Sequence, residues 1–448
     1  MQPYSFSTYF LKYLNRQVFL IYIFQRVVSC YLILMITINL SKFKKTNGVF
    51  VNSYAFGHSV TETSIFFHQY GHEGVCLSVG NRNNRNKYLK NLFEPYKLLH
   101  FWLPNINDIN IYHALRLRVH DAIDLSFRKS RVVKILLKRN LVIVRRDVML
   151  NASAISSLQR DYKLSKEDST RIVKSFDSVY SKSQSETSMS SLHYLVQQKT
   201  LVDYSLSKNL LRFNSRFLKK AEILANEKSY SEIKICTIVL RRSWKPWSGL
   251  GLDSYSQVFD YLESRNYLIN LIGDVDEFYG LKKAKKFNTL NSNFEYGLNP
   301  KIFQILSIIN SNFCIGDQSG LQALIHFLNK RNLIINSVPF GQLQYNSVVL
   351  PRIWVDQNGI KATTEEHFSN LMYRYHSIKK GNDLSIYPQY YSSETVFDTV
   401  KNFVEANESN QTTLELDLKG FTNIGPECMA LFSKNTSFSP ILLKEFES

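Results

Sequence analysis

From Gly48 onward, short apolar runs alternate with amphipathic stretches, which is typical of strand–helix–strand units in a protein with a parallel sheet. The first complete unit has a strand at 49–56, a helix at 59–70 and a strand at 74–79. Further elements are expected in this half as strands at 98–103 and 141–144, helices at 111–125, 166–175 and 211–226, and a Ser/Thr-rich loop at 181–191.

A second alternating series begins near residue 233 and has the same form. Its expected strands are 235–240, 267–272, 312–315 and 332–335, and its expected helices are 254–265, 300–310, 318–329 and 394–405. A chain of 448 residues exceeds what one hydrophobic core usually supports, so two series predict two domains. We therefore expect an α/β fold with two Rossmann-like domains, at 47–225 and 226–405, and a C-terminal tail at 406–448.

Residues 1–46 form a separate N-terminal segment, which we expect to be helical and associated with a membrane. Its apolar centre, from Val18 to Leu40, is interrupted at Arg26, and an arginine there would cost about 2.5–3.5 kcal/mol in the middle of a bilayer. A shallow, interfacial or re-entrant anchor is therefore favoured over a full span. The alternative is a helix that packs on the globular body. The flanking basic residues suit an anionic membrane surface: Lys12, Arg16, Lys42, Lys44 and Lys45.

The charge balance limits the classes of partner. Lys and Arg number 55 against 37 acidic residues, a formal charge of +18, which favours anionic ligands or surfaces. The basic residues are spread along the chain without zinc spacing, a helix-turn-helix or an RNP-like aromatic pattern, so a nucleic-acid partner is disfavoured. The five cysteines stand far apart without a CxxC pair, which indicates a reducing compartment and no cysteine metal site.

The clearest chemical signal is the segment Phe313–Gly320, in which a strand ends, a glycine turn follows and a helix begins with small residues. The free N–H groups of such a helix start attract anions, and small residues let a phosphate approach the backbone. The candidate ligand-binding residues here are Gly316, Asp317, Ser319 and Gly320. The alternative is an ordinary turn in which Asp317 or Ser319 caps the helix.

Two other predicted strands also end in residues that suit ligand binding. Arg241 and Arg242 directly follow one strand, and Gly273 and Asp274 end the next. Open α/β sheets bind ligands at the carboxyl ends of their strands, where guanidinium groups could clamp a diphosphate. A pair of solvated surface arginines is the alternative. Together with the Gly316 turn, these signals predict one ligand site at the sheet edge.

In the first half, His58 stands at the start of a helix and Glu62 lies one turn later, so the two share a helix face. A histidine oriented by a carboxylate could deprotonate an acceptor hydroxyl, which makes His58 and Glu62 the candidate catalytic pair. The alternative is a capping box formed by Ser59 and Glu62. His68 and His72 lack a matching carboxylate spacing, so no metal site is expected.

In this order, the segments GHSVTE, LRRSW, GD and FCIGDQSGLQAL resemble a family of bacterial glycosyltransferases from surface-polysaccharide and O-antigen gene clusters. The resemblance covers about residues 48 to 405 and implies a GT-B type fold with two facing Rossmann-like domains, an N-terminal acceptor domain and a C-terminal donor domain. It also implies that Arg241 contacts the donor diphosphate, that the Gly316 turn cradles it, and that His58 lines the interdomain cleft. The family's histidine two residues before the arginine is absent here, where Val239 stands.

By that resemblance the chain is expected to be a metal-independent, hexosyltransferase-like enzyme without a cofactor. It would transfer a sugar from a nucleotide-diphosphate sugar to a lipid-linked oligosaccharide in lipopolysaccharide or O-antigen synthesis. The expected location is the cytoplasmic face of the inner membrane, as a peripheral or monotopic protein. Two alternatives stay open: a nucleotide-sugar epimerase of the same fold, and a non-catalytic membrane-associated assembly protein.

Overall fold

The computed structural model describes part of the chain. The described residues are 27, 30, 34, 38, 46–51, 57, 60, 63, 66, 75–80, 93–94, 97–102, 141–144, 155–156, 159, 164–171, 174, 212–213, 219, 234–241, 252–273, 300–317, 319–328, 330–337, 347–361, 386–409 and 436–438. The chain divides into two compact units. The first comprises 1–149 and 210–212, and the second comprises 150–209 and 213–448.

The first unit contains a four-stranded parallel sheet with the order β4-β2-β1-β5. Its strands are β1 (Thr46–Val51), β2 (Val75–Gly80), β4 (Lys97–Trp102) and β5 (Leu141–Val144). Between β1 and β2 the helical residues Val60, Thr63 and Phe66 are fully buried at a spacing of three, so one face of this helix is covered. The described parts of this unit therefore match the strand–helix–strand pattern read from the sequence.

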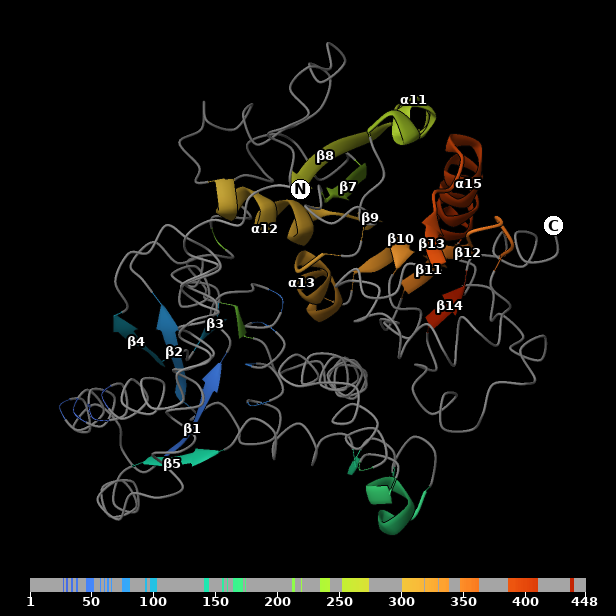
Figure 1. Cartoon of the computed structure of the whole chain (residues 1–448). Coiled ribbons are helices and arrows are strands. Elements are labelled where there is room, and N and C mark those ends of the chain that lie inside the picture. The colour runs from blue at the N-terminus through green and yellow to red at the C-terminus, as the bar shows by residue number, and fades with distance from the viewer. Residues whose placement is uncertain are drawn as a thin grey trace, which may run out of the picture. The chain divides into compact units, whose positions relative to one another are not determined.

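The second unit contains a six-stranded sheet with the order β14-β11-β10-β9-β7-β8, and every pair in it is parallel (Figure 1). Its strands are β7 (Lys234–Leu240), β8 (Tyr267–Gly273), β9 (Phe313–Asp317), β10 (Arg331–Ser337), β11 (Ser347–Pro351) and β14 (Thr436–Phe438). Their apolar runs are nearly continuous because helices cover both faces of a parallel sheet.

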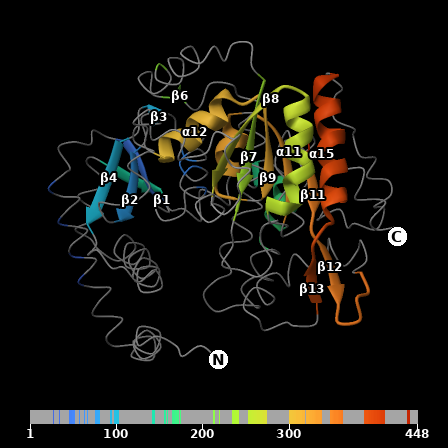
Figure 2. The ribbon, with the colours of Figure 1, turned by 90° about the horizontal axis from the view of Figure 1, so that it is seen from above.

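Helices lie on both faces of this sheet (Figure 2). The 3₁₀ helix η2 (Leu252–Tyr255) and α11 (Ser256–Ser264) follow β7, and α11 packs against α15 (Ser393–Glu408) on one face. On the other face, α12 (Pro300–Asn310) contacts α13 (Leu321–Phe327). The second unit is thus a doubly wound α/β layer structure.

The core on the α11/α15 face is aromatic and aliphatic. Phe313 at the start of β9 meets Phe403 of α15 edge to face, with ring centroids 5.5 Å apart, and lies 5.0 Å from the ring of Tyr267. Ser392 caps α15, since its Oγ accepts from the Thr395 N–H at 3.0 Å. The helix buries one apolar stripe: Val396, Val400, Phe403 and Val404. This stripe fixes α15 on the sheet.

The α/β class with a parallel sheet is confirmed, and the four expected strands of the second half are all present. The prediction of a helix at 211–226 is wrong at its start, because Arg212–Phe213 is the short strand β6, which pairs with β3 (Phe93–Glu94). Helix 318–329 begins later than expected, because β9 continues to Asp317 and α13 starts at Leu321.

Six of the described strands were not expected from the sequence. Besides β3, β6, β11 and β14 these are β12 (Ile353–Asp356) and β13 (Ile386–Gln389), which form a separate antiparallel pair. In the N-terminal segment, Val27, Cys30, Leu34 and Ile38 are helical, and the rest of its expected helix lies outside the described residues. Among the helices that the structure describes, none is both long and apolar enough to cross a membrane. The facing arrangement of two domains stays a prediction.

Candidate functional site

The strand order of the second unit contains one reversal of direction. From β7 the chain passes to β8 on one side and then returns to place β9 on the other side of β7. The helix after β7, α11, packs with α15 on one face of the sheet, and the helix after β9, α13, contacts α12, which lies on the other face (Figure 2). In doubly wound proteins this switch point, at the carboxyl ends of the strands, is where ligands bind.

The structure brings four of the predicted site residues to this one edge. Gly316 pairs with Val239 near the end of β7, and Gly273 pairs with Leu240. The backbone N–H of Arg241 donates to Asp317 Oδ2 at 3.2 Å, which ties the end of β7 to the end of β9. Asp317 is only 2% exposed, so its carboxylate serves this contact inside the edge and is not displayed to solvent.

Both glycines sit where the backbones approach closely. Gly273 has φ +99° and Gly316 has φ +143°, conformations that side chains rarely adopt. A Cβ at Gly316 would collide with the carbonyl oxygen of Val239, and one at Gly273 with that of Leu240. The two glycines therefore pack the edge tightly on either side of β7, and this explains the residue type whether or not a ligand binds.

The start of α13 is organised by local hydrogen bonds. Ser319 Oγ accepts from the Leu321 N–H at 3.2 Å, and Ser319 O accepts from the Gln322 N–H at 3.1 Å. Gly320, with φ −63°, stands at the N-cap position without a side-chain cap. Ser319 thus accepts from one N–H of the helix start although it lies before the N-cap, and a hydroxyl that accepts one bond still has a proton to donate.

Residues that the sequence analysis missed also lie at this edge. Tyr255 of η2 is fully buried, and its pKa is raised by burial and by the negative charge of Asp317, so the phenol keeps its proton. Asn336, which follows Ile335 near the end of β10, is 5% exposed and has φ +58°. Arg352, after β11, is fully buried with its guanidinium 4.7 Å from the Tyr390 ring centroid. None belongs to a recognisable motif. Asn336 and Arg352 follow apolar runs, but this position alone does not identify a site residue, and no signal in the sequence marks Tyr255.

His58, Glu62, Arg242 and Asp274 lie outside the described residues. Their roles therefore stay predictions. Within the described ranges, no group of three or more His, Cys, Asp or Glu side chains is placed to hold a metal ion.

The fold and edge together define a doubly wound α/β protein with a candidate ligand site at its switch point. No family model matches the chain, and no curated protein matches it. It is similar to the solved structure of Escherichia coli ADP-heptose lipopolysaccharide heptosyltransferase II, with 12% identity, 81% of this chain and 99% of that chain covered, and a TM-score of 0.40.

Two other solved structures have the same kind of similarity. One is a family 9 glycosyltransferase from Veillonella parvula, with 11% identity, 81% and 97% coverage and a TM-score of 0.39. The other is a UDP-GlcNAc 2-epimerase from Methanocaldococcus jannaschii, with 11% identity, 81% and 99% coverage and a TM-score of 0.32. At identities and TM-scores this low, the three likenesses carry no argument about the activity of this chain.

Proposed function

We propose that the chain is a glycosyltransferase that uses a nucleotide-diphosphate sugar and binds it at the carboxyl edge of the second unit's sheet. The observation that carries the proposal is that the start of the Arg241 segment and the Gly316 turn meet at the switch point of a doubly wound sheet. Val239 pairs with Gly316, and the Arg241 N–H donates to Asp317. Arg241 is partly buried, and its guanidinium is a group that suits a departing diphosphate.

In the proposed reaction the acceptor hydroxyl attacks the anomeric carbon of the sugar. His58 takes the hydroxyl proton, with Glu62 orienting it, and the bond from the anomeric carbon to the diphosphate oxygen breaks. The nucleoside diphosphate leaves with the electron pair, and the positive charge of Arg241 stabilises it. Arg242, Asp274, Ser319 and Gly320 complete the proposed donor site, and no metal or cofactor is required.

We also propose a lipid-linked oligosaccharide as the acceptor, in surface-polysaccharide synthesis at the inner face of the cytoplasmic membrane. One feature of the N-terminal segment supports a membrane location. Its helical residues Val27, Leu34 and Ile38 are 62%, 57% and 63% exposed at a spacing that places them on one helix face. An exposed apolar stripe in a chain with a charge of +18 suits a membrane with anionic lipids.

The test is the melting temperature of the full-length protein with UDP, ADP, GDP and the corresponding nucleotide sugars. A ligand that binds the folded state must raise the melting temperature, so at least one of these nucleotides should do so. Arg241→Ala should weaken the binding of that nucleotide about 10- to 100-fold, because a hydrogen bond to a charged group contributes about 1.5–3 kcal/mol. Absence of a shift with every nucleotide would refute the proposal.

Arg265→Ala is the matched control, since Arg265 lies at the amino end of β8 and contacts Glu408 instead of the proposed ligand edge. It should leave the nucleotide-induced shift unchanged. Product analysis with the nucleotide sugar alone separates a transferase from an epimerase. Release of an epimerised nucleotide sugar without any acceptor would exclude the transferase and favour the epimerase.

A further inference from the structure

Two buried side chains at the carboxyl edge have polar atoms without a hydrogen-bond partner. Among the described residues these include the hydroxyl of Tyr255 and both the Nδ2 and the Oδ1 atoms of Asn336. Buried polar groups in native proteins are nearly always paired, because leaving them unpaired costs the full desolvation penalty. Two such groups at the switch point of one sheet therefore call for an explanation at that place.

Besides its unpaired amide, Asn336 has an unfavourable backbone conformation. Its φ of +58° is left-handed, a conformation that favours glycine and that asparagine tolerates better than most residues. It is also skipped in the pairing of β10 with β11, since Ile335 pairs with Leu350 and Ser337 with Pro351. The irregularity places Asn336 directly after the residue of β10 that pairs with Asp317. Stability alone would favour glycine at this position, which points to a role for the amide.

Tyr255 reaches the same edge from η2. Its ring is fully buried and stacks on Phe259, with centroids 6.2 Å apart, so the ring is held in place. The raised pKa caused by burial and by the Asp317 charge keeps the hydroxyl protonated, and a phenol can both donate and accept a hydrogen bond. The amide of Asn336 likewise both donates and accepts.

We infer that Asn336 and Tyr255 bind hydroxyl groups of the nucleotide sugar, on the ribose or on the transferred sugar. The inference rests on the proposed function. It adds two uncharged side chains that bind hydroxyl groups to the site in which Arg241 binds the diphosphate. A phosphate only accepts hydrogen bonds, so it would leave Asn336 Oδ1 unpaired. A hydroxyl both donates and accepts, which matches both side chains.

The first experiment measures the melting temperature without any ligand. Asn336→Gly and Tyr255→Phe remove unpaired polar groups, so neither should lower the melting temperature of the full-length protein. Tyr267→Phe is the control for the tyrosine, because the Tyr267 hydroxyl donates to Glu408 Oε1 at 3.2 Å and its loss should lower the melting temperature. A clear loss of stability in Asn336→Gly or Tyr255→Phe would mean that these groups are paired within the protein, and would overturn the inference.

The second experiment measures binding of the nucleotide sugar that stabilises the natural protein, of its nucleoside diphosphate and of inorganic pyrophosphate. Asn336→Gly and Tyr255→Phe should each weaken the binding of the nucleotide sugar about tenfold and leave the binding of pyrophosphate unchanged. If the nucleoside diphosphate loses as much affinity as the nucleotide sugar, the contact is to the ribose. If only the nucleotide sugar loses affinity, the contact is to the transferred sugar.

Asn266→Gly is the matched control for Asn336→Gly, because Asn266 is the other described asparagine with a left-handed φ, at +61°, and is exposed at the amino end of β8. It should bind all three ligands like the natural protein. Unchanged nucleotide-sugar binding in both test variants would overturn the inference while the proposed function stands. Failure of the natural protein to bind any nucleotide would remove both.

Discussion

At the scale of single residues, Gly316 is a position, like Gly273, where the backbone leaves no room for a side chain. Gly316→Ala should lower the free energy of unfolding by about 3 kcal/mol or more, because the new Cβ collides with the Val239 carbonyl and strains a positive φ. Gly359→Ala should cost only about 1–2 kcal/mol, since Gly359 has φ +79° but nothing near its missing Cβ. Urea unfolding of the full-length variants measures both values. Similar losses in the two variants would show that the close approach of β9 to β7 is not tight.

The residues of the candidate site differ in how far the sequence could predict them. Arg241, Gly273 and Gly316 could be placed together, because each ends an apolar run and parallel strands bring their carboxyl ends to one edge. Asn336 and Tyr255 could not, since an unpaired buried group is recognised only when all its neighbours are known. The same holds for Asp317, whose buried contact with the Arg241 N–H depends on residues 76 positions apart.

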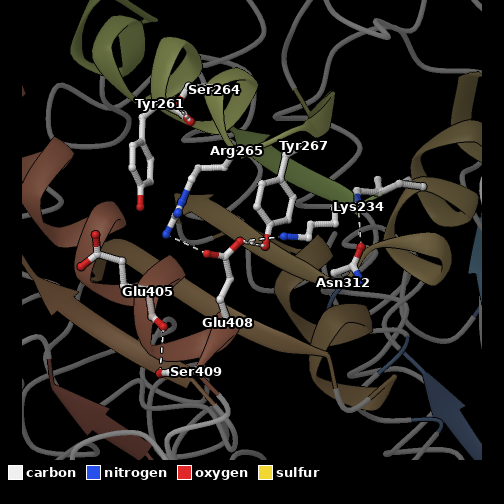
Figure 3. A network of polar contacts seen from close by, with 10 residues as sticks. Lys234, Tyr261, Ser264, Arg265, Tyr267, Asn312, Glu405, Glu408 and Ser409 are labelled. Carbon is white, nitrogen blue, oxygen red and sulfur yellow. Dashed lines mark hydrogen bonds and ion pairs between the residues drawn. The ribbon is translucent and has the colours of Figure 1, made fainter. Parts of the chain in front are cut away.

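At the scale of elements, the C-terminal end of α15 is held on the sheet by a cluster around Glu408 (Figure 3). Its carboxylate accepts from Lys234 Nζ at 2.9 Å, pairs with Arg265 Nη2 at 2.8 Å and accepts from the hydroxyl of Tyr267. Glu408→Gln should lower the free energy of unfolding by about 1 kcal/mol, because the partly exposed ion pairs are lost. Arg171→Gln, which breaks the exposed pair with Asp168, should cost less than about 0.5 kcal/mol.

The effect of Glu408→Gln on stability should depend on pH. The hydrogen bond from Lys234, supported by the charges of Lys234 and Arg265, lowers the pKa of Glu408 in the folded protein. A lowered folded pKa contributes stability that is fully present above the unfolded pKa, about 4.3, and is lost as the pH falls through the folded value. The difference in stability between the natural protein and Glu408→Gln should therefore shrink below about pH 4. A constant difference across this range would contradict the assignment.

The elements that the sequence failed to predict depend on their neighbours in the fold. β14 has only three residues, and β11 is a short run ending at Pro351, so neither shows a period of its own. Each becomes a strand because the edge of a parallel sheet offers hydrogen bonds, to β11 in one case and to β10 in the other. By contrast, α12 was predicted at its observed bounds, Pro300–Asn310, since a proline start and a strong apolar stripe are local signals.

At the scale of the whole molecule, the sequence predicted two α/β series but not the order of the strands. A repeating strand–helix pattern predicts parallel strands, while the placement of β9 beside β7 on the side away from β8 depends on how the faces pack. That order creates the switch point on which the proposed donor site depends. The sequence therefore predicted which residues end the strands, and the structure supplied which of those ends are neighbours.

The proposed association with membranes concerns the whole chain, and its prediction depends on the exposed stripe at Val27, Leu34 and Ile38. Replacing all three with serine should reduce co-sedimentation with phosphatidylglycerol-containing vesicles at least tenfold, because each buried apolar side chain contributes about 1.5–3 kcal/mol. Ile360→Ser is the matched control, since Ile360 is 65% exposed in a turn of the second unit and should not matter.

Salt separates the two contributions to this binding. Raising the ionic strength should weaken vesicle binding by both the natural protein and the triple variant, because screening acts on the charge of +18. The ratio of their vesicle affinities should stay the same. A ratio that stays constant means that the apolar stripe enters the bilayer interface independently of the basic residues. Binding of the triple variant equal to that of the natural protein at every salt concentration would leave charge alone as the attraction, and the N-terminal segment would then have no role as an anchor.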